Sequence, residues 1–386
     1  MKVLFISTSA NSDDRKAWSG TVYQAFRALV RAGHDVDYLS AMRDYRQTFT
    51  DKLLCTYWLR VPGRFGKLTR MDESLYTVRV FRQTLRRFDY SPYDVIFVPT
   101  HLAIMNALPR RLKAKVVHLV DATVDSLFGY YTEFSNLWFH NYWEAHWLGR
   151  RAFRRSDLII ASSQWAADNA VRQYGVDPRR IGVVEFGANI DAADIPEIAA
   201  KNYDPRQRLR VYWSGVNWQR KGGDVALDAC RHLRQRGYDM EFNITGMREL
   251  PEGAKDLPWV VNHGFLNKNN PEEYRRLIEI MAEQDIFLFP SRAECSSIAL
   301  CEANAFALPC FVYDTGGTAN YVEQGRNGRM LPLSATGSDF ADAIEDALRN
   351  GKLPDMSRQA AQKYRSALNW EVWSEKVNRL LREIEC

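Results

Sequence analysis

Short runs of apolar residues alternate along the chain with longer stretches in which apolar residues recur every three or four positions. The short runs are bounded by polar or turn-forming residues, as is typical of strands that are buried on both faces. Helical stretches between such strands predict parallel sheets with helices on both faces. Six expected strands lie at 2–7, 36–39, 95–98, 116–120, 158–161 and 182–186. Six more lie at 209–213, 240–245, 260–265, 286–289, 310–313 and 329–333.

Two such series of strands predict two domains. A length of 386 residues also exceeds the size of one ordinary hydrophobic core. A largely polar stretch at 192–208, which contains Pro196 and Pro205, separates the two series. We therefore expect an α/β fold with two doubly wound, Rossmann-like domains at 1–195 and 196–362, followed by a C-terminal helix at 363–386.

The helical stretches carry apolar stripes. The expected helix at 21–31 places Val22, Phe26, Leu29 and Val30 on one stripe, and Gly33 ends it. Similar patterns predict helices at 224–236 and 271–284. In the last helical segment, 361–384, the stripe consists of Trp370, Trp373, Val377 and Leu380 or Leu381.

Residues 42–92 are less regular than the rest and are rich in basic and aromatic side chains. Such a segment could rest on a membrane surface. It could equally be a solvated helical insertion. We favour the insertion, because the segment shows no clean amphipathic run.

The net charge of +5 is concentrated near the start of the chain. The first hundred residues hold 16 Lys and Arg against 10 Asp and Glu, whereas residues 101–200 hold 11 of each. A basic face favours a phosphate-rich partner, such as an anionic lipid or an acidic glycan. Nucleic acid comes last among these partners, because no DNA- or RNA-binding motif accompanies the charge.

Cysteine and histidine spacing gives no sign of a metal or redox site. The six Cys form no Cys-x-x-Cys pair, the seven His have no metal-ligand grouping, and His118 is expected inside a strand. The first apolar run is too short for a signal peptide, and no run approaches the roughly 20 apolar residues of a spanning helix. We therefore expect a cytoplasmic protein with reduced thiols.

Two carboxylates eight residues apart mark the most informative segment. Glu294 follows the expected strand at 286–289, and Glu302 lies in the helix that starts just after it. Ligands of open α/β sheets collect at the carboxyl ends of strands. The start of a helix offers free N–H groups to a phosphate, and carboxylates accept hydrogen bonds from sugar hydroxyls. One short segment can therefore hold both halves of a nucleotide-sugar. Ser296, Ser297 and Ile298 at this helix start are candidate residues for binding such a sugar donor.

Three further loops are expected to contribute to the same site. The loop after the strand at 209–213 carries Gly215, Asn217, Arg220 and Lys221, and its two cations suit a diphosphate leaving group. Gly316, Gly317 and Thr318 follow the strand at 310–313, where glycines let backbone amides approach a ligand. In the first series, Gly20 and Thr21 at the start of a helix are candidates for binding the donor phosphates or sugar. Asp121 at a strand end is grouped with Glu294, Arg220 and Lys221 as a catalytic candidate, because it could accept a sugar hydroxyl or interact with the acceptor nucleophile.

Together these segments resemble the retaining GT-B glycosyltransferases of family 4, over nearly the whole chain. The resemblance lies in 19–21, 33–36, 162–163, 186–191, 220–222, the Glu294–Glu302 pair, and 314–318 with Glu323 and Gly325. It implies two Rossmann-like domains facing across a cleft, with the C-terminal helix docking back on the first domain. The acceptor would bind the first domain and the nucleotide-sugar donor the second.

The resemblance also implies residue roles. Arg220 and Lys221 would stabilise the departing diphosphate, Glu294 would bind donor-sugar hydroxyls, and Glu302 would bind the ribose. Gly316, Gly317 and Thr318 would line the donor pocket. The anomeric configuration would be retained, and no metal would be needed. The acceptor would be a glycan or a lipid-linked saccharide. Separately, the basic charge of the first domain predicts peripheral contact with a membrane.

The chain departs from the family pattern at three places. Ser296-Ser297 stands where many members have an aromatic–Gly pair, Val216 stands where many have Arg, and Asp121 stands where many have His. Two other functions remain open on the residues alone: a nucleotide-sugar epimerase with the same two-domain layout, and a non-catalytic sugar-binding protein. The sequence does not fix the base or the sugar of the donor.

Overall fold

The computed structural model of the protein describes residues 1–197, 200–202, 204 and 206–384. The chain divides into two compact units. The first unit holds Met1–Val184 and the segment from Ser374 onward, and the second holds Glu185–Trp373. The polar stretch at 192–208 lies within the second unit, and Pro205 is outside the described residues. Each unit is described by itself.

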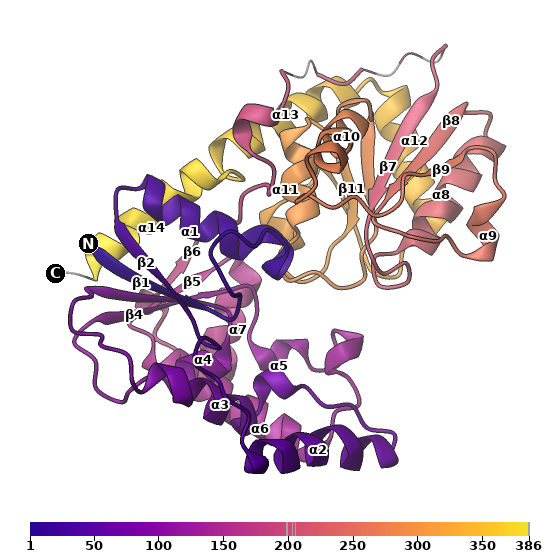
Figure 1. Ribbon diagram of the computed structural model, residues 1–386. Coiled ribbons are helices and arrows are strands. Elements are labelled where there is room, and N and C mark those ends of the chain that lie inside the picture. Colours follow the sequence, from indigo (N-terminus) through magenta and orange to yellow (C-terminus); the bar gives the residue numbers. More distant parts are fainter. Residues whose placement is uncertain (198–199, 203, 205, 385–386) are drawn as a thin grey trace. The chain divides into compact units, whose positions relative to one another are not determined.

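A parallel sheet of six strands forms the centre of the first unit, in the order β2-β1-β3-β4-β5-β6. The strands are β1 Lys2–Ser7, β2 Asp35–Ser40, β3 Val95–Pro99, β4 Lys115–Val120, β5 Leu158–Ala161 and β6 Ile181–Val183. Nearly every side chain of β1, β3, β4 and β5 is buried, because helices cover the sheet (Figure 1). The apolar runs of the sequence are thus strands buried on both faces.

Seven α-helices connect and flank these strands. They are α1 Thr21–Arg31, α2 Phe49–Arg64, α3 Leu75–Leu85, α4 Leu102–Ala107, α5 Val124–Leu127, α6 Phe139–Arg155 and α7 Gln164–Tyr174. The C-terminal helix α14, Trp370–Glu383, joins this unit from Ser374 onward. The Ser374 hydroxyl donates to the Ala28 carbonyl of α1 over 2.8 Å, so this helix docks on the first unit as expected.

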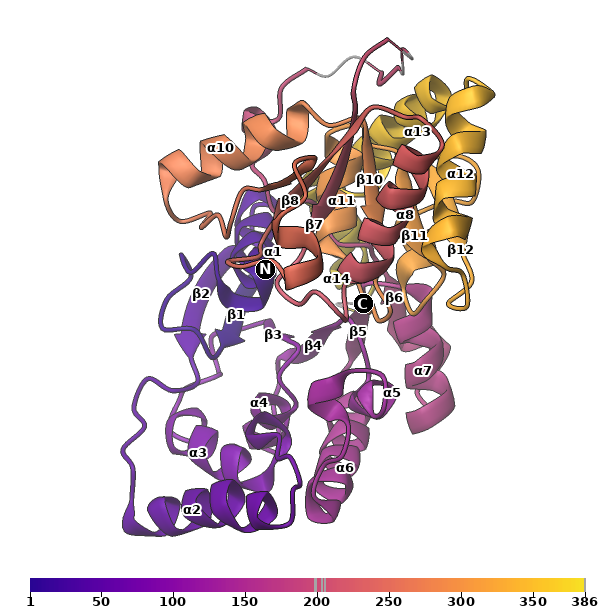
Figure 2. The same ribbon diagram turned by 90° about the vertical axis from the view of Figure 1, so that its right-hand side faces the viewer.

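The second unit repeats the architecture with the strand order β12-β11-β10-β7-β8-β9, again all parallel. Its strands are β7 Leu209–Ser214, β8 Met240–Thr245, β9 Val260–Asn262, β10 Ile286–Phe289, β11 Cys310–Tyr313 and β12 Gly328–Leu331. Its helices are α8 Gly223–Gln235, α9 Glu252–Lys255, α10 Pro271–Ala282, α11 Ile298–Ala305, α12 Gly337–Arg349 and α13 Leu353–Ser366. Figure 2 shows these helices on both faces of the second sheet.

All twelve expected strands are present, but β6, β9 and β12 end earlier than the apolar runs suggested. Phe265 and Leu333, which were included in two of those runs, lie beyond the strand ends and are exposed. The sequence pattern counts any apolar residue, whereas a strand ends where pairing with its neighbour ends. His118 lies inside β4 and is fully buried, as expected.

Two helix predictions need correction. The segment expected as one helix at 361–384 is two helices, because Asn369 caps the second: its Oδ1 accepts from the Val372 N–H over 2.9 Å. The stripe of the second helix was right, since Trp370, Trp373, Val377 and Leu381 are buried. In α1, Val30 is exposed, and Ala25 and Ala28 share the buried face with Val22 and Leu29.

The irregular segment 42–92 is largely helical, as α2 and α3 with a short 3₁₀ helix, η2 (Met71–Glu73), between them. Thr48 and Asp51 form a capping box at the start of α2: the Asp51 N–H donates to Thr48 Oγ1 and the Thr48 N–H donates to Asp51 Oδ2. The helical insertion favoured from the sequence is therefore present. Among the residues that the structure describes, no helix has the length and apolar character needed to cross a bilayer.

Candidate functional site

The candidate site of the second unit lies where the strand order reverses. From β7 the chain moves outward on one side through β8 and β9, and then returns to the other side of β7 as β10. The loops that follow β7 and β10 therefore leave the sheet in opposite directions, which opens space at the carboxyl ends of these two strands. Arg220 and Lys221 belong to the first of these loops and Glu294 belongs to the second.

Internal hydrogen bonds fix the loop between β7 and α8. Asn217 accepts twice, from the Arg220 N–H at its side-chain Oδ1 over 2.9 Å and from the Lys221 N–H at its carbonyl over 3.0 Å. The Trp213 indole N–H donates to the Lys221 carbonyl over 3.0 Å. Gly222 completes the loop with a φ of 68°, and a Cβ there would lie 1.9 Å from the Pro290 carbonyl oxygen. Asn217, predicted to bind the donor, thus shapes the loop that presents the two cations.

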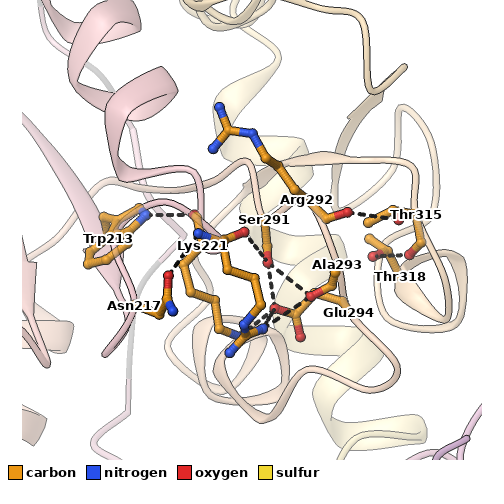
Figure 3. A network of polar contacts seen from close by, with 10 residues as sticks. Trp213, Asn217, Lys221, Ser291, Arg292, Ala293, Glu294, Thr315 and Thr318 are labelled. Atoms are coloured by element: carbon orange, nitrogen blue, oxygen red, sulfur yellow. Dashed lines mark hydrogen bonds and ion pairs between the residues drawn. The ribbon is translucent and has the colours of Figure 1, made fainter. Parts of the chain in front are cut away.

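The loop that follows β10 brings Glu294 against these cations (Figure 3). Glu294 Oε1 contacts Lys221 Nζ directly, accepts from Ser291 Oγ over 2.7 Å and lies 3.8 Å from Arg220 Nη1. The Glu294 side chain is only 5% exposed. Because an isolated charge is costly to bury, the three charged side chains depend on one another. The structure therefore joins three of the residues that the sequence assigned to catalysis.

The environment of Lys221 sets its chemistry. Burial lowers the pKa of the Lys221 ammonium, and the nearby Glu294 carboxylate opposes part of that shift. The ammonium also lies 4.9 Å from the centre of the Phe289 ring. Two cations here face one carboxylate, and hydrogen bonds between charged groups are strong in such a shielded place. The arrangement is therefore suited to an anionic group such as a diphosphate.

The loop after β11 is tied to the same segment. The Gly317 N–H donates to the Glu294 carbonyl over 3.0 Å, and Thr315 Oγ1 donates to the Arg292 carbonyl over 3.4 Å. Thr318 Oγ1 closes the loop by donating to the Thr315 carbonyl over 2.7 Å. Gly316 adopts a φ of 53° in this turn. The predicted residues Gly316, Gly317 and Thr318 thus lie next to Glu294.

Glu302 occupies a second polar cluster on α11. Its Oε1 contacts Lys268 Nζ, and Lys268 also donates to the Asn189 carbonyl over 3.4 Å. Glu302 is only 8% exposed. Nothing in the sequence analysis selected Lys268, because it lies in a loop whose partners are distant in sequence; its place between β9 and α10 was the only available signal.

The start of α11 holds the remaining candidates. Ser297 is the residue before the helix and is 3% exposed, and among the described residues its hydroxyl finds no hydrogen-bond partner. Ser296 and Ile298 flank it and are half-buried. A buried hydroxyl without a partner, next to the first N–H groups of a helix, can donate a hydrogen bond to a ligand oxygen.

In the first unit, Gly20 and Thr21 begin α1 after a distorted turn. Trp18, Ser19 and Gly20 all have positive φ, at 48°, 59° and 93°. Such backbone is costly for residues other than glycine and concentrates at functional sites. Asp121 directly follows β4 and is half-buried. These residues lie at the carboxyl edge of the first sheet, as their strand assignments predicted.

The strand order of the first unit reverses between β1 and β3, and the residues that meet there were not selected from the sequence. Thr8 follows β1, and its Oγ1 lies 3.0 Å from Nε2 of His101, which comes shortly after β3. Burial lowers the pKa of His101, which favours the neutral imidazole. The signal that could have found this pair is its position after β1 and β3, the two strands between which the order reverses.

Among the described ranges, no group of three or more His, Cys, Asp or Glu side chains is arranged to hold a metal ion.

Comparison with known proteins assigns a family to each half of the chain. The family model described as "Glycosyltransferase Family 4" matches residues 20–192. The model described as "Glycosyl transferases group 1" matches residues 208–350, which include every candidate residue of the second unit.

Individual proteins agree with these matches. The chain is 27% identical over 232 residues to a D-inositol 3-phosphate glycosyltransferase of Rhodococcus jostii, covering 56% of this chain and 50% of that protein. It is 27% identical over 195 residues to the amylovoran biosynthesis glycosyltransferase AmsK of Erwinia amylovora, covering 47% and 45%. The matched regions span about half the length of these relatives.

A solved structure shows the same fold over the whole length. The Anabaena protein Alr3699/HepE, in complex with UDP-glucose, matches with a TM-score of 0.62 at 17% identity, covering 99% of this chain and 100% of that chain. The two parallel six-stranded sheets are thus those of the GT-B fold. With both halves matched by glycosyltransferase models and the fold shared throughout, the chain belongs to the family 4 and group 1 glycosyltransferases.

Proposed function

We propose that the protein is a retaining, metal-independent glycosyltransferase that moves a hexose from a nucleotide diphosphate to a saccharide acceptor. The observation that carries this proposal is the cluster of Lys221, Arg220 and Glu294 where the strand order of the second unit reverses. Two cations and a carboxylate within reach of one another match a donor that presents a diphosphate beside sugar hydroxyls.

In this mechanism, each side chain has a separate task. Lys221 and Arg220 stabilise the negative charge that develops on the diphosphate as the glycosidic bond to the donor breaks. Glu294 accepts hydrogen bonds from donor-sugar hydroxyls and keeps the two cations in place. Glu302, held in place by Lys268, accepts hydrogen bonds from the ribose hydroxyls. The leaving phosphate takes the acceptor proton on the same face of the sugar, which retains the anomeric configuration.

For the donor, we propose a uridine nucleotide, because the structural neighbour HepE was solved with UDP-glucose. For the acceptor, we propose a glycan or a lipid-linked saccharide that binds the first unit, because relatives of the chain include an enzyme of amylovoran biosynthesis. A lipid-linked acceptor would bring the first unit to a membrane surface.

A panel of nucleotide-sugars tests the donor first. A donor that binds the native protein raises its melting temperature, so UDP-, GDP- and ADP-sugars can be ranked by thermal shift. The donor that shifts most is then incubated with candidate acceptors in the presence of a metal chelator, and the product anomer is read by NMR. Loss of transfer with chelator would contradict metal independence, and an inverted anomer would contradict retention. Isomerised sugar without any acceptor would indicate an epimerase.

The site itself is tested with Glu294→Ala and a matched control, Glu345→Ala. Glu345 also pairs with two arginines, Arg236 and Arg349, and is similarly shielded, but it lies on α12. We expect Glu294→Ala to abolish nearly all transfer and Glu345→Ala to leave it close to wild type, with the folded fraction of both checked by circular dichroism. Equal activity of the two variants would remove Glu294 from the mechanism.

A further inference from the structure

The first unit exposes an unusual group of large apolar side chains. We call Phe65, Leu68, Phe139, Trp143 and Trp147 the aromatic patch; their exposed fractions are 66%, 46%, 61%, 62% and 38%. Single exposed apolar residues are normal on a protein surface, but a contiguous group marks an interaction site. In the described part of the second unit, Phe265 is the only Phe or Trp that is exposed to a comparable degree.

The patch is continuous across two segments that are distant in sequence. Phe65, just after α2, stacks on Trp138 with ring centres 5.4 Å apart, and Trp138 contacts Phe139 at 5.1 Å. Leu68 is held to the same segment, because its N–H donates to the Asn136 carbonyl over 3.1 Å. The ends of the two helices are therefore fastened together on the outside of the unit (Figures 1 and 2).

Helix α6 carries more apolar surface than the core needs. Ala145, Leu148 and Ala152 are buried and already supply a stripe that faces the unit. Phe139, Trp143 and Trp147 are spaced four residues apart and form a second stripe, which stays exposed. The Trp143 and Trp147 rings stack at 6.5 Å. Folding of the unit does not explain this second stripe.

The exposed charge of α2 and α6 is all positive. Their exposed cations, with those of the adjoining loop, are Lys52, Arg60, Arg64, Lys67, Arg150 and Arg154. The acidic residues within the two helices are Asp51 and Glu144. Asp51 has no exposed side-chain surface and pairs with Arg79, and Glu144 is half-buried. The patch is therefore bordered by cations without an exposed carboxylate on either helix.

We propose that the aromatic patch is a docking surface for an anionic lipid bilayer. Phe and Trp rings enter the boundary between headgroups and acyl chains, while flanking Lys and Arg side chains contact lipid phosphates. A second copy of this chain would bring the same positive rim against itself, which is unfavourable. The aromatic side chains need an apolar partner and the surrounding cations need a negative one. An anionic bilayer offers both, because its acyl chains are apolar and its headgroups are negative.

This inference changes the interpretation of residues 42–92. The sequence favoured a solvated insertion, because α2 alone shows no clean amphipathic pattern. The structure supplies the missing half of the surface from α6 and the segment before it, which no window of contiguous sequence contains. Docking of the bilayer depends on the patch alone and needs no transferase activity, so it can fail or hold independently of the proposed function.

Flotation with vesicles tests the apolar half of the surface. The full chain is mixed with vesicles of phosphatidylcholine alone or of phosphatidylcholine and phosphatidylglycerol in equal parts. We expect binding to the anionic vesicles only, and a loss of about tenfold or more in the variant Phe139→Ser/Trp143→Gln, since burial of each large side chain is worth several-fold in binding. The control Phe265→Ser removes an exposed Phe of the second unit and should bind like wild type.

The charged half is tested with Arg60→Ala/Arg64→Ala/Lys67→Ala. Each cation near an anionic surface contributes about 1 kcal/mol, so three should change affinity by roughly 10²-fold at low salt, with a smaller difference at high salt. The control Arg179→Ala/Arg206→Ala removes highly exposed cations elsewhere. Melting temperatures verify folding. The proposal is overturned if the wild-type protein does not bind anionic vesicles, or if the patch variants bind them normally. It is also overturned if sedimentation shows a wild-type dimer that a patch variant converts to a monomer.

Discussion

The two units share a topology but use it differently. Both sheets are parallel, and in both the order reverses beside the first strand, between β1 and β3 in one and between β7 and β10 in the other. In the second unit, this position holds buried charges: Lys221, Arg220 and Glu294. In the first unit, it holds the neutral Thr8–His101 pair, beside a turn of strained backbone. The fold thus provides the location, and the side chains decide which ligand it suits.

The units also differ in the number of strands that lie beyond their first strands, β1 and β7. In the second unit, two strands, β8 and β9, lie beyond β7, whereas the first unit has only β2 beyond β1. The chain between β2 and β3 forms the helices α2 and α3 instead of a further strand. This part of the first unit therefore lies on the surface as helices instead of extending the sheet. The end of α2, together with α6, carries the aromatic patch.

The largest expected effect comes from removing a charge that only the second unit has. Lys221→Ala should lower kcat by about 10²–10³-fold, because loss of one preorganised electrostatic partner of a developing negative charge typically costs that much. Lys363→Ala is the matched control, since its side chain is also shielded and pairs with Glu323 over 2.9 Å, on α13. Steady-state kinetics with a donor validated by thermal shift measures both. Equal kcat values would mean that the charged position of the second unit is structural only.

The next effect concerns the loop that presents those charges. Gly222→Ala should destabilise the protein by about 3 kcal/mol, from a left-handed backbone and from overlap with the Pro290 carbonyl. Gly237→Ala, at the other end of α8, has a φ of 94° but no atom within 4 Å of the added Cβ, so it should cost only about 1 kcal/mol. Urea unfolding gives both free energies. A difference near zero would show that the loop after β7 adapts readily.

Burial of His118 should contribute acid sensitivity to the first unit. Burial lowers the pKa of His118 to about 4, against about 6.5 in an unfolded chain. Between these values the unfolded state binds the proton and the folded state does not, so stability falls as pH falls through 6.5 and stops falling below 4. From pH 7 to pH 5 the loss is about 2 kcal/mol.

Hydrogen exchange resolved by unit can measure this loss in the full chain. Between pH 7 and pH 5, slow amides of β4 and its neighbours should lose more protection in wild type than in His118→Phe, after correction for intrinsic exchange rates. His118→Phe should remove the His118 contribution of about 2 kcal/mol, and the ring should be tolerated because the site already packs against Phe153. His232→Gln, at a half-buried position on α8, is the control and should leave it unchanged. An equal loss of protection in wild type and His118→Phe would contradict the assignment to His118.

Sequence reasoning recovered the strands because they are short apolar runs with polar ends, and those inside each sheet, such as β3, β5 and β10, are fully buried. This pattern needs no knowledge of partners. It recovered Glu294 and Lys221 for a related reason: both follow core strands, so position along the chain implied position in space. It missed Ser291, Lys268 and His101, whose roles arise from contacts across distant segments. Asn369 was readable as a helix cap and would have corrected the single helix expected at 361–384.

The smallest predicted effect tests whether helix α2 of the insertion belongs to the core of the first unit. Thr48→Ala removes half of the capping box of α2 and should cost about 1 kcal/mol, seen as several-fold faster hydrogen exchange within α2 alone. Thr336→Ala breaks the equivalent box of α12, a helix whose buried face includes Phe340, Ile344 and Leu348. Because α12 is part of the core of its unit, we expect its loss to lower the urea midpoint of the whole second unit. If Thr48→Ala also lowered the midpoint of the first unit, α2 would be part of that core, and its exposed face would have a structural explanation.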